Sequence, residues 1–141
     1  MQLFLGTYDY SMDDRGRIPV PPSFREALMQ GIVLTQGTPQ RCLRAYSLDK
    51  FEEKAAVYLQ QPETTQAGRD MRLAVFSSAQ PVAMDAQSRI LVPPVLRQWA
   101  GLARQVFVVG TGDSFTIWNA GDYEGAAALA QERHLRTLGA E

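Results

Sequence analysis

The sequence is poor in cysteine, histidine and lysine, and it contains no long hydrophobic run. Cys42 is the only cysteine among 141 residues, so no disulfide can form within the chain. Chains without disulfides are typical of a reducing compartment, and we expect a cytoplasmic protein. No apolar run approaches the roughly 20 residues that a membrane-spanning helix needs. The first residues lack a basic stretch and a long apolar segment, so we expect no signal peptide.

Residues that perform catalysis or bind metals are also sparse. The single histidine, His134, has no other histidine and no cysteine near it in the sequence, which argues against a metal site. No serine, cysteine or lysine lies in a nucleophile–base motif, and no glycine-rich loop with a lysine could hold a phosphate. The sequence therefore predicts a protein that is not an enzyme and that has neither a cofactor nor a small-molecule substrate.

The charge distribution leaves nucleic-acid binding open. The net charge is −1 and the pI is about 5.8, which does not favour DNA, although net charge says little about a local patch. Between Arg69 and Arg104 the chain carries five arginines against two aspartates, a local charge of +3. Twelve of its fourteen basic residues are arginine. Arginine suits phosphates and guanine edges, but it is equally favoured in buried ion pairs.

The chain contains an internal repeat. The segment from Met12 to Arg25 aligns without gaps on the segment from Met84 to Arg97, with eight of fourteen positions identical at an offset of 72. The similarity continues beyond this block. Residues 32–35 correspond to 106–109, residues 43–46 to 115–118, and Phe51 to Tyr123. Two homologous halves are therefore predicted, at 1–68 and 69–141, sharing one compact unit.

Each half shows the same order of predicted elements. Asp13 and Gly16 have turn chemistry, Pro19 indicates an edge strand or a bulge, and the pair Pro21-Pro22 opens a short helix. The first half is predicted to have strands at 3–12 and 17–20, a helix at 23–30, a hairpin at 32–46 and a helix at 48–61. After a polar loop at 62–68, the second half is predicted to have strands at 76–84 and 89–92, a helix at 94–102, a hairpin at 106–118 and a helix from 120 to about 138.

The paired Asp-x-x-x-Arg turns, each running into Ile-x-Val-Pro-Pro-x-(Phe/Leu)-Arg, closely resemble the MraZ family of bacterial regulators. Arg72, the segments 77–79 and 108–110, and the strand at 115–118 add to the match, which covers nearly the whole chain. The resemblance implies a β-rich α+β fold: a tandem-duplicated swapped-hairpin (double AbrB-like) barrel with short helices.

The resemblance also implies a function. Members of the family assemble into closed rings and bind short direct repeats upstream of the division and cell-wall gene cluster that contains their own gene. We therefore expect a nucleoid-associated repressor whose partners are double-stranded DNA and further copies of itself. Asp13 and Arg17 occupy the first family motif, and Asp85 and Arg89 occupy the second.

This chain departs from the family pattern at two positions. Ser88 stands where the second motif usually has glycine, and we expect it to alter that turn or to reduce its contribution to binding. Pro19 replaces a more usual aliphatic or polar residue, and we expect it to stiffen the first return strand.

The turn residues divide into two predicted roles. Arg15, Gly16, Arg17 and Arg89 are the candidate DNA-binding residues. Because the counterpart of Arg15 in the second half is the neutral Gln87, we expect the first turn to dominate binding. Arg17 has two open roles, contact with DNA or closure of the hairpin by pairing with Asp13. Phosphates would repel Asp13 and Asp85, so we expect these aspartates to hold the turns and orient the arginines. Gly16 supplies a backbone conformation that a side chain resists.

Other residues have simpler expected roles. We expect Arg25 and Arg97 to form ion pairs at the edge of the core, and the strand aromatics, Phe76 among them, to be core. Arg69 and Arg72 could widen a basic face, be solvated or lie in an interface.

Two alternative functions remain. The chain could be an AbrB-like scaffold that binds a protein partner without specific DNA binding, a hypothesis that the short helical tail disfavours. It could also be a small hydrolase with Asp13 and Asp85 as paired carboxylates, but turn chemistry already accounts for both residues.

Overall fold

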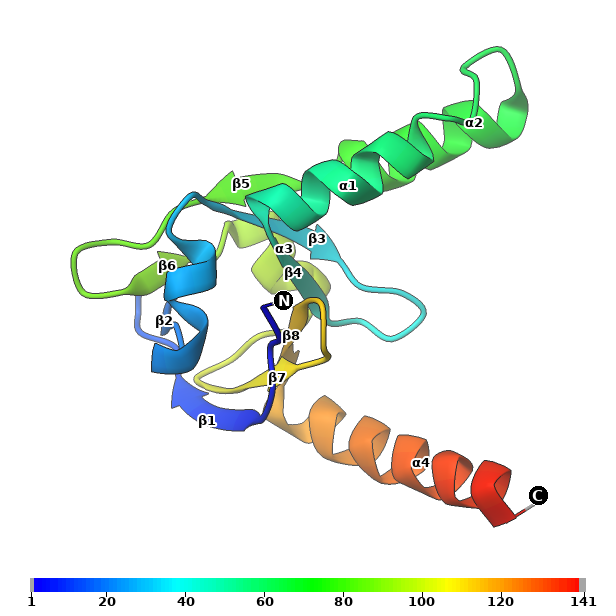
Figure 1. The fold of residues 1–141 in the computed structure, drawn as a ribbon. Coiled ribbons are helices and arrows are strands. Elements are labelled where there is room, and N and C mark those ends of the chain that lie inside the picture. Colours follow the sequence, from blue (N-terminus) through cyan, green and yellow to red (C-terminus); the bar gives the residue numbers. More distant parts are fainter. Residues whose placement is uncertain (1, 140–141) are drawn as a thin grey trace.

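A computed structural model describes residues 2–139 as one β-rich body from which helices project (Figure 1). Its elements follow the repeat closely. In chain order they are β1 (Thr7–Ser11), β2 (Arg17–Pro19), η1 (Pro22–Phe24), η2 (Glu26–Leu28), β3 (Ile32–Gln36), β4 (Leu43–Ser47), α1 (Leu48–Tyr58), α2 (Gln66–Met71), η3 (Arg72–Phe76), β5 (Gln80–Val82), β6 (Arg89–Leu91), α3 (Pro94–Trp99), β7 (Gln105–Gly110), β8 (Phe115–Asn119) and α4 (Ala120–Gly139).

The strands form two antiparallel sheets. One has six strands in the order β1-β7-β8-β4-β3-β5, and the other is the pair β2-β6. Helices are short apart from α1 and α4, so the β-rich α+β class is confirmed. Pro19 ends β2, whose only partner is β6, so its missing N–H breaks no central ladder.

Strands from the two halves of the sequence pair with each other throughout. β1 pairs with β7, β2 with β6, β3 with β5, and β4 with β8. Two of these pairs are centred on a residue and its own repeat counterpart. Ile18 lies opposite Ile90, and Arg44 lies opposite Thr116, each 72 residues apart. Because each of these antiparallel pairs is centred on two equivalent residues, an approximate local twofold axis relates the two halves there.

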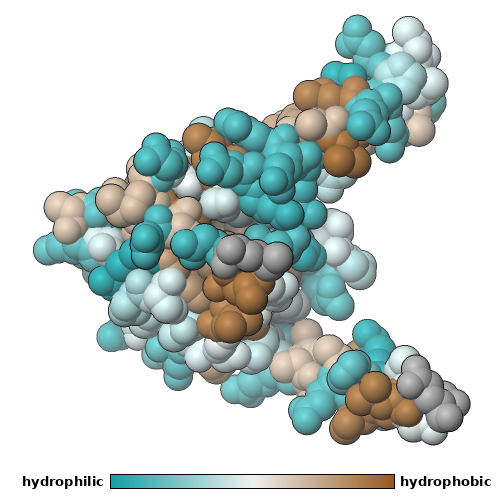
Figure 2. Space-filling model, viewed as in Figure 1, coloured by the Kyte–Doolittle hydropathy of each residue, from teal (hydrophilic) through white to brown (hydrophobic). Residues whose placement is uncertain are grey.

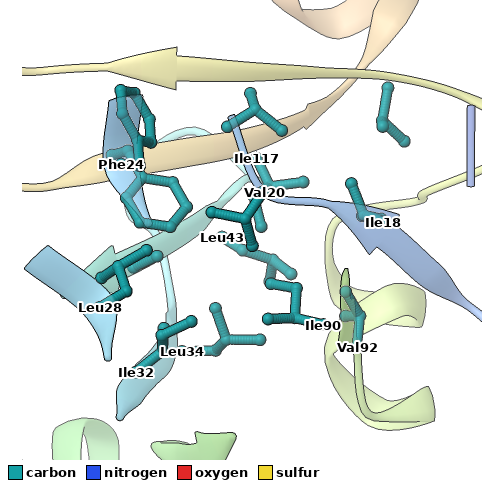
Figure 3. Close-up of a cluster of buried hydrophobic side chains, with 14 of the residues drawn as sticks. Ile18, Val20, Phe24, Leu28, Ile32, Leu34, Leu43, Ile90, Val92 and Ile117 are labelled. Carbon is teal, nitrogen blue, oxygen red and sulfur yellow. The ribbon is translucent and has the colours of Figure 1, made fainter. Parts of the chain in front are cut away.

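The hydrophobic core draws on both halves. Ile18 and Ile90 are 0% and 2% exposed and point into one cluster with Leu43 and Ile117 (Figure 3). Beside them, the ring of Phe24 packs edge-on against that of Phe4, with centroids 5.0 Å apart. The same apolar surface therefore stabilises both repeats at once.

The segment between the halves differs from the prediction. Residues 62–68 are not wholly a loop, because α2 begins at Gln66, where the hydroxyl of Thr65 accepts a hydrogen bond from the N–H of Gly68 at 3.0 Å. The strand predicted at 76–84 is present only over Gln80–Val82, and its predicted first residue, Phe76, instead ends the π-helix η3.

Packing against α1 explains this helical segment. The ring of Phe76 meets those of Phe51 and Tyr58 edge-on, each at 6.3 Å between centroids. The hydroxyls of Ser77 and Ser78 donate to carbonyls of the preceding turn, which closes the helix. Phe76 therefore lies at the end of a helix and packs against α1, instead of lying in a strand and filling the core.

Two further elements are shorter than predicted. The helix expected at 23–30 is a pair of 3₁₀ turns, η1 and η2. The strand expected at 3–12 is ordered as β1 over Thr7–Ser11, and Phe4 adds an isolated bridge to Gly112. In residues 2–139, no helix has both the length and the apolar character to cross a membrane.

The pairing of β2 with β6 generates a stability prediction. Ile90→Ala would remove a buried side chain at the centre of that pair and lower the free energy of unfolding by about 2–5 kcal/mol. Leu91→Ala, in the same strand but half exposed, would change it by no more than about 0.5 kcal/mol. Urea denaturation followed by circular dichroism measures both, and equal effects of the two variants would contradict a shared core at this position.

Candidate nucleic-acid interface

The first Asp-x-x-x-Arg turn is held by the carboxylate of Asp13. Its Oδ1 accepts hydrogen bonds from the backbone N–H groups of Arg15 and Arg17, at 3.0 and 2.9 Å. Its Oδ2 accepts from the Nε of Arg17 at 2.6 Å, which is also an ion pair. The N–H of Gly16 closes the turn on the carbonyl of Asp13 at 3.0 Å. A single carboxylate therefore fixes both the turn and the direction of the Arg17 side chain.

The second turn repeats this geometry. Oδ1 of Asp85 accepts from the backbone N–H groups of Gln87 and Arg89, at 2.9 and 3.0 Å. Its Oδ2 accepts from the Nε of Arg89 at 3.0 Å. Ser88 has a φ of +58° and its N–H bonds to the carbonyl of Asp85 at 3.0 Å, as Gly16 does in the first turn. The turn therefore keeps the hydrogen bonds of the first turn although serine replaces glycine. The other alternative, that this turn contributes less to binding, stays a prediction.

The two turns are fastened to each other at one end of the molecule. The N–H of Val20 donates to the carbonyl of Ser88 at 2.9 Å, and the N–H of Val92 donates to that of Gly16 at 3.0 Å. Arg89 also reaches across, with its Nη1 3.9 Å from Oδ2 of Asp13. Figure 1 shows the resulting pair of loops beside β2 and β6, away from α4. They form one paired surface, which we call the double-turn face (residues 13–17 and 85–89).

Two features favour glycine at position 16. Its φ of +86° lies in the region that residues with a Cβ resist. A Cβ built at this position would also lie 2.6 Å from Cζ of Arg97, whose guanidinium packs on the turn. Any side chain here would displace Arg97.

Hydrogen bonds explain the acidity of the two aspartates. The backbone N–H of Arg17, ahead of its side chain, lowers the pKa of Asp13 below its ordinary value. The backbone N–H of Arg89 does the same for the pKa of Asp85, with further help from that of Gln87. Both carboxyls are thus ionised acceptors in the folded chain rather than a pair that shares a proton.

The arginines of the double-turn face differ in their exposure and in their hydrogen bonds to the rest of the chain. The side chain of Arg15 is exposed and makes no hydrogen bond or ion pair within residues 2–139. The side chains of Arg17 and Arg89 are 28% and 29% exposed, and the Nε of each donates a hydrogen bond to an aspartate. Within the described chain the terminal nitrogens of Arg17 make no hydrogen bond, so pairing with Asp13 leaves them available to a ligand.

Arg104 joins the site from another element. It lines a hollow with Asp13, Asp14, Arg15 and Arg17. In the sequence, Arg104 is notable only for its contribution to the local charge. Its position just before the second hairpin, compared with the first half, is the feature that could have indicated the site. Arg104 directly precedes β7, and its counterpart in the first half is Gln30.

The other arginines have structural or distant positions. The expected ion pairs of Arg25 and Arg97 are not found among residues 2–139. Arg25 instead donates its Nε to the carbonyl of Val20 at 3.0 Å, and Arg97 packs on Gly16. Arg69 and Arg72 bond to carbonyls of the loop after α1, so they do not extend the double-turn face.

No group of three or more histidine, cysteine, aspartate or glutamate side chains within residues 2–139 is arranged to hold a metal ion. His134 is exposed on α4.

The sequence carries a family signature over this whole architecture. The family model described as "MraZ protein, putative antitoxin-like" matches residues 3–73 and 75–138, which include both turns. The chain belongs to the MraZ family.

Individual MraZ relatives match most of the chain. The "Transcriptional regulator MraZ" of Leifsonia xyli subsp. xyli is 39% identical over 122 residues, covering 86% of this chain and 85% of the relative. Proteins of the same name from Kineococcus radiotolerans and Roseiflexus castenholzii are each 37% identical, over 86% and 83% of this chain and 85% and 81% of their own lengths. The similarity therefore extends over both halves.

The aspartates generate a pH prediction. Because the pKa values of Asp13 and Asp85 are lowered by folding, their contribution to stability is complete above the ordinary value of about 3.9 and is lost as the pH falls through the lowered values. Arg17→Gln would raise the pKa of Asp13 only part of the way to its ordinary value, because the backbone N–H of residue 17 still donates to the carboxylate. Carbon-13 NMR titration measures this change. No rise at all, or a full return to the ordinary value, would contradict the assigned causes, and Arg133→Gln on α4 is the control.

Proposed function

We propose that this chain is a sequence-specific DNA-binding transcriptional repressor that acts as a ring-shaped oligomer. It binds direct repeats upstream of its own gene in the division and cell-wall gene cluster, as its membership of the MraZ family suggests. The name "Transcriptional regulator MraZ", borne by its relatives, supports the regulatory role. The contact surface is the double-turn face.

One observation carries this proposal. Two hairpin turns of the same geometry are fastened together and present arginine side chains from a rigid scaffold. Arg15 is exposed at the tip of the first turn with no internal partner in the described chain. Arginine presents five N–H donors in a planar fork, which can bind a phosphate or a guanine edge in two places at once. A preformed arrangement avoids the entropy cost of ordering a loop on binding.

Asp13 and Asp85 have a positioning role in this proposal. A carboxylate near DNA phosphates would be repelled, so direct contact with the backbone is unfavourable. By holding Nε of Arg17 and of Arg89, the aspartates fix the direction of both side chains. The terminal nitrogens of Arg17 make no hydrogen bond in the described chain, while Nη1 of Arg89 lies 3.9 Å from Oδ2 of Asp13. The same carboxylates offset part of the arginine charge, which makes a single copy a weak binder.

A ring overcomes this weakness by presenting several copies. When one double-turn face is bound, the next is held near the following repeat at a high effective concentration. The gain requires that the spacing of DNA repeats match the spacing of faces around the ring. A chain with a net charge of −1 can then bind DNA, because only the displayed faces need to be basic.

The projecting helices supply the surface for assembly. Beyond Ala127, every described residue of α4 is exposed, including Leu129, Leu135 and Leu138. Val57 of α1 and Leu73 of η3 are likewise exposed, and Figure 2 shows apolar residues gathered on both projections. A helix end with no tertiary contacts is marginally stable in water, so contact with a neighbouring copy would stabilise it.

We further infer that the fold is a tandem duplication of swapped-hairpin, AbrB-like repeats, 1–68 and 69–141, interleaved in one unit. The pairing of each strand with a strand of the other half supports this inference. The equivalent registers Tyr8 to Val108 and Gln80 to Leu34 support it further.

The DNA proposal predicts a specific loss of binding. Arg15→Ala would weaken binding to the chain's own upstream repeats by about tenfold or more, because one charged contact is lost from every copy in the ring. Gln87→Ala, at the same place in the second turn, would change affinity by less than about threefold, since it removes no charge. Fluorescence anisotropy at two salt concentrations measures both, against native and scrambled repeats.

A charge-matched control distinguishes a specific contact from general attraction. Arg133→Ala removes one exposed positive charge from α4, far from the double-turn face in Figure 1, and would leave affinity nearly unchanged. Equal affinity for native and scrambled DNA would overturn sequence specificity. Wild-type binding by both Arg15→Ala and Arg17→Ala would overturn the face itself.

The ring generates a separate prediction about mass. Leu135→Asp combined with Leu138→Asp would place charges in the proposed contact and convert the assembly to smaller species. Val95→Asp, an equally exposed apolar position on α3, would leave the mass unchanged. Native mass spectrometry distinguishes these outcomes. A monomeric wild-type chain would exclude the ring.

A further inference from the structure

A second site shares no residue with the double-turn face and does not depend on the DNA proposal. It is a hollow of about 230 Å³ between strands β3 and β4, helix α1 and the π-helix η3. Its walls include Tyr46, Phe51 and Tyr58, and its basic side chains are Arg44 and Lys54. We call it the linker hollow, because η3, from the segment between the two repeats, forms one wall.

The two cations of the linker hollow have no acidic partner. Arg44 and Lys54 are half-buried, and neither makes a salt bridge within residues 2–139. Lys50, one turn earlier on the same helix, instead pairs with Glu53 at 3.2 Å and Asp113 at 3.6 Å. The Nζ of Lys54 lies 5.5 Å from the ring centroid of Tyr46. Partly buried positive charges are costly without a counter-charge, so the hollow favours an anion.

The internal repeat shows that the fold does not need these cations. The counterpart of Arg44 is Thr116, and that of Lys54 is Ala126. Two of the three aromatic walls persist, because Trp118 and Tyr123 are the counterparts of Tyr46 and Phe51, whereas the counterpart of Tyr58 is Ala130. The Nε1 of Trp118 donates to the hydroxyl of Thr116 at 2.7 Å. The same scaffold is thus built in the second half with a neutral internal hydrogen bond in place of two charges. Arg44 and Lys54 are therefore present in one half only.

The aromatic walls define the rest of the ligand. Tyr46 is 7% exposed, and burial raises the pKa of its hydroxyl while the charge of Arg44 acts in the opposite direction. Phe51 and Tyr58 offer apolar surface on the helical side. A cavity of 150 Å³ accepts benzene, so this hollow has room for one ring with a charged group and little more.

We propose that the linker hollow binds a small organic anion, a phosphate or carboxylate carried on a body no larger than one aromatic ring. The charged group lies between Arg44 and Lys54, and the ring packs against Phe51 and Tyr58. η3 makes part of the wall, and π-helical turns are frequent at functional sites.

The test uses phenyl phosphate and benzoate as probes, with benzyl alcohol as the neutral analogue, on the full-length assembled protein. Saturation-transfer NMR and calorimetry detect binding irrespective of the size of the assembly. Phenyl phosphate or benzoate would bind saturably, and the stronger of the two would identify the charged group. Benzyl alcohol would bind at least about tenfold more weakly, because it lacks the charge.

Matched variants test whether the probes bind in the linker hollow. Lys54→Gln and Arg44→Gln would each weaken it by about tenfold, Arg44→Lys would restore part of it, and Lys50→Gln would change it by less than about twofold. Lys54 is on a helix surface, so its variant folds even if the Arg44 variant does not. Failure of both anions to bind, an equal loss in Lys50→Gln, or binding of benzyl alcohol as strong as that of the anions would overturn the proposal. So would a drop in oligomer mass in the variants without anion binding, since the cations would then serve an acidic group of a neighbouring copy.

Discussion

The antiparallel contact between Ile18 and Ile90 is the constraint on which the rest of the structure depends. Each residue is the repeat counterpart of the other, so the two halves meet there as equivalents. Their side chains fill the core while the turns just before them are forced to one end of the molecule. The double-turn face is therefore a consequence of the core. Neither turn could take its observed place without the strand that follows the other.

The parts of the fold that the sequence predicts are those determined locally. The contacts that hold Asp13 run to residues no more than four positions away, so the turn can be read from its own sequence. Both β-hairpins and the strand after each turn follow from the same short-range patterns. The partnership of Asp13 with Arg17 was one of two open roles, and the geometry places the two in contact while leaving part of the guanidinium available.

The parts that could not be predicted depend on long-range packing. The apolar residues before Gln80 fit a strand as well as a helix, and only the contact of Phe76 with the rings of α1 selects the helix. Arg97 shows the same limit at the site. Its place on a short helix at the edge of the core suggested an ion pair, whereas its position against Gly16 depends on how β2 and β6 bring the two halves together.

The differences between the halves separate folding from function. Both halves retain the aspartate and the arginine that build the turn, but Arg15 has the neutral counterpart Gln87. Arg44 and Lys54 likewise have neutral counterparts, Thr116 and Ala126, in a half that keeps two of the three aromatic wall residues. Each half can thus be compared with the other at equivalent positions. A charge that is present in one half only is not needed to form the fold that both halves share.

The most direct measurement is site-specific photo-crosslinking to DNA that contains the native upstream repeats. A photoreactive amino acid replaces Arg15, Gln87 or Leu129 in separate proteins, and the crosslinked bases are mapped. If the double-turn face binds DNA, the probes at 15 and 87 crosslink within the repeats, whereas the probe at 129 on α4 does not. Crosslinks from position 129 alone would contradict the account and would place the DNA on the projecting helix instead.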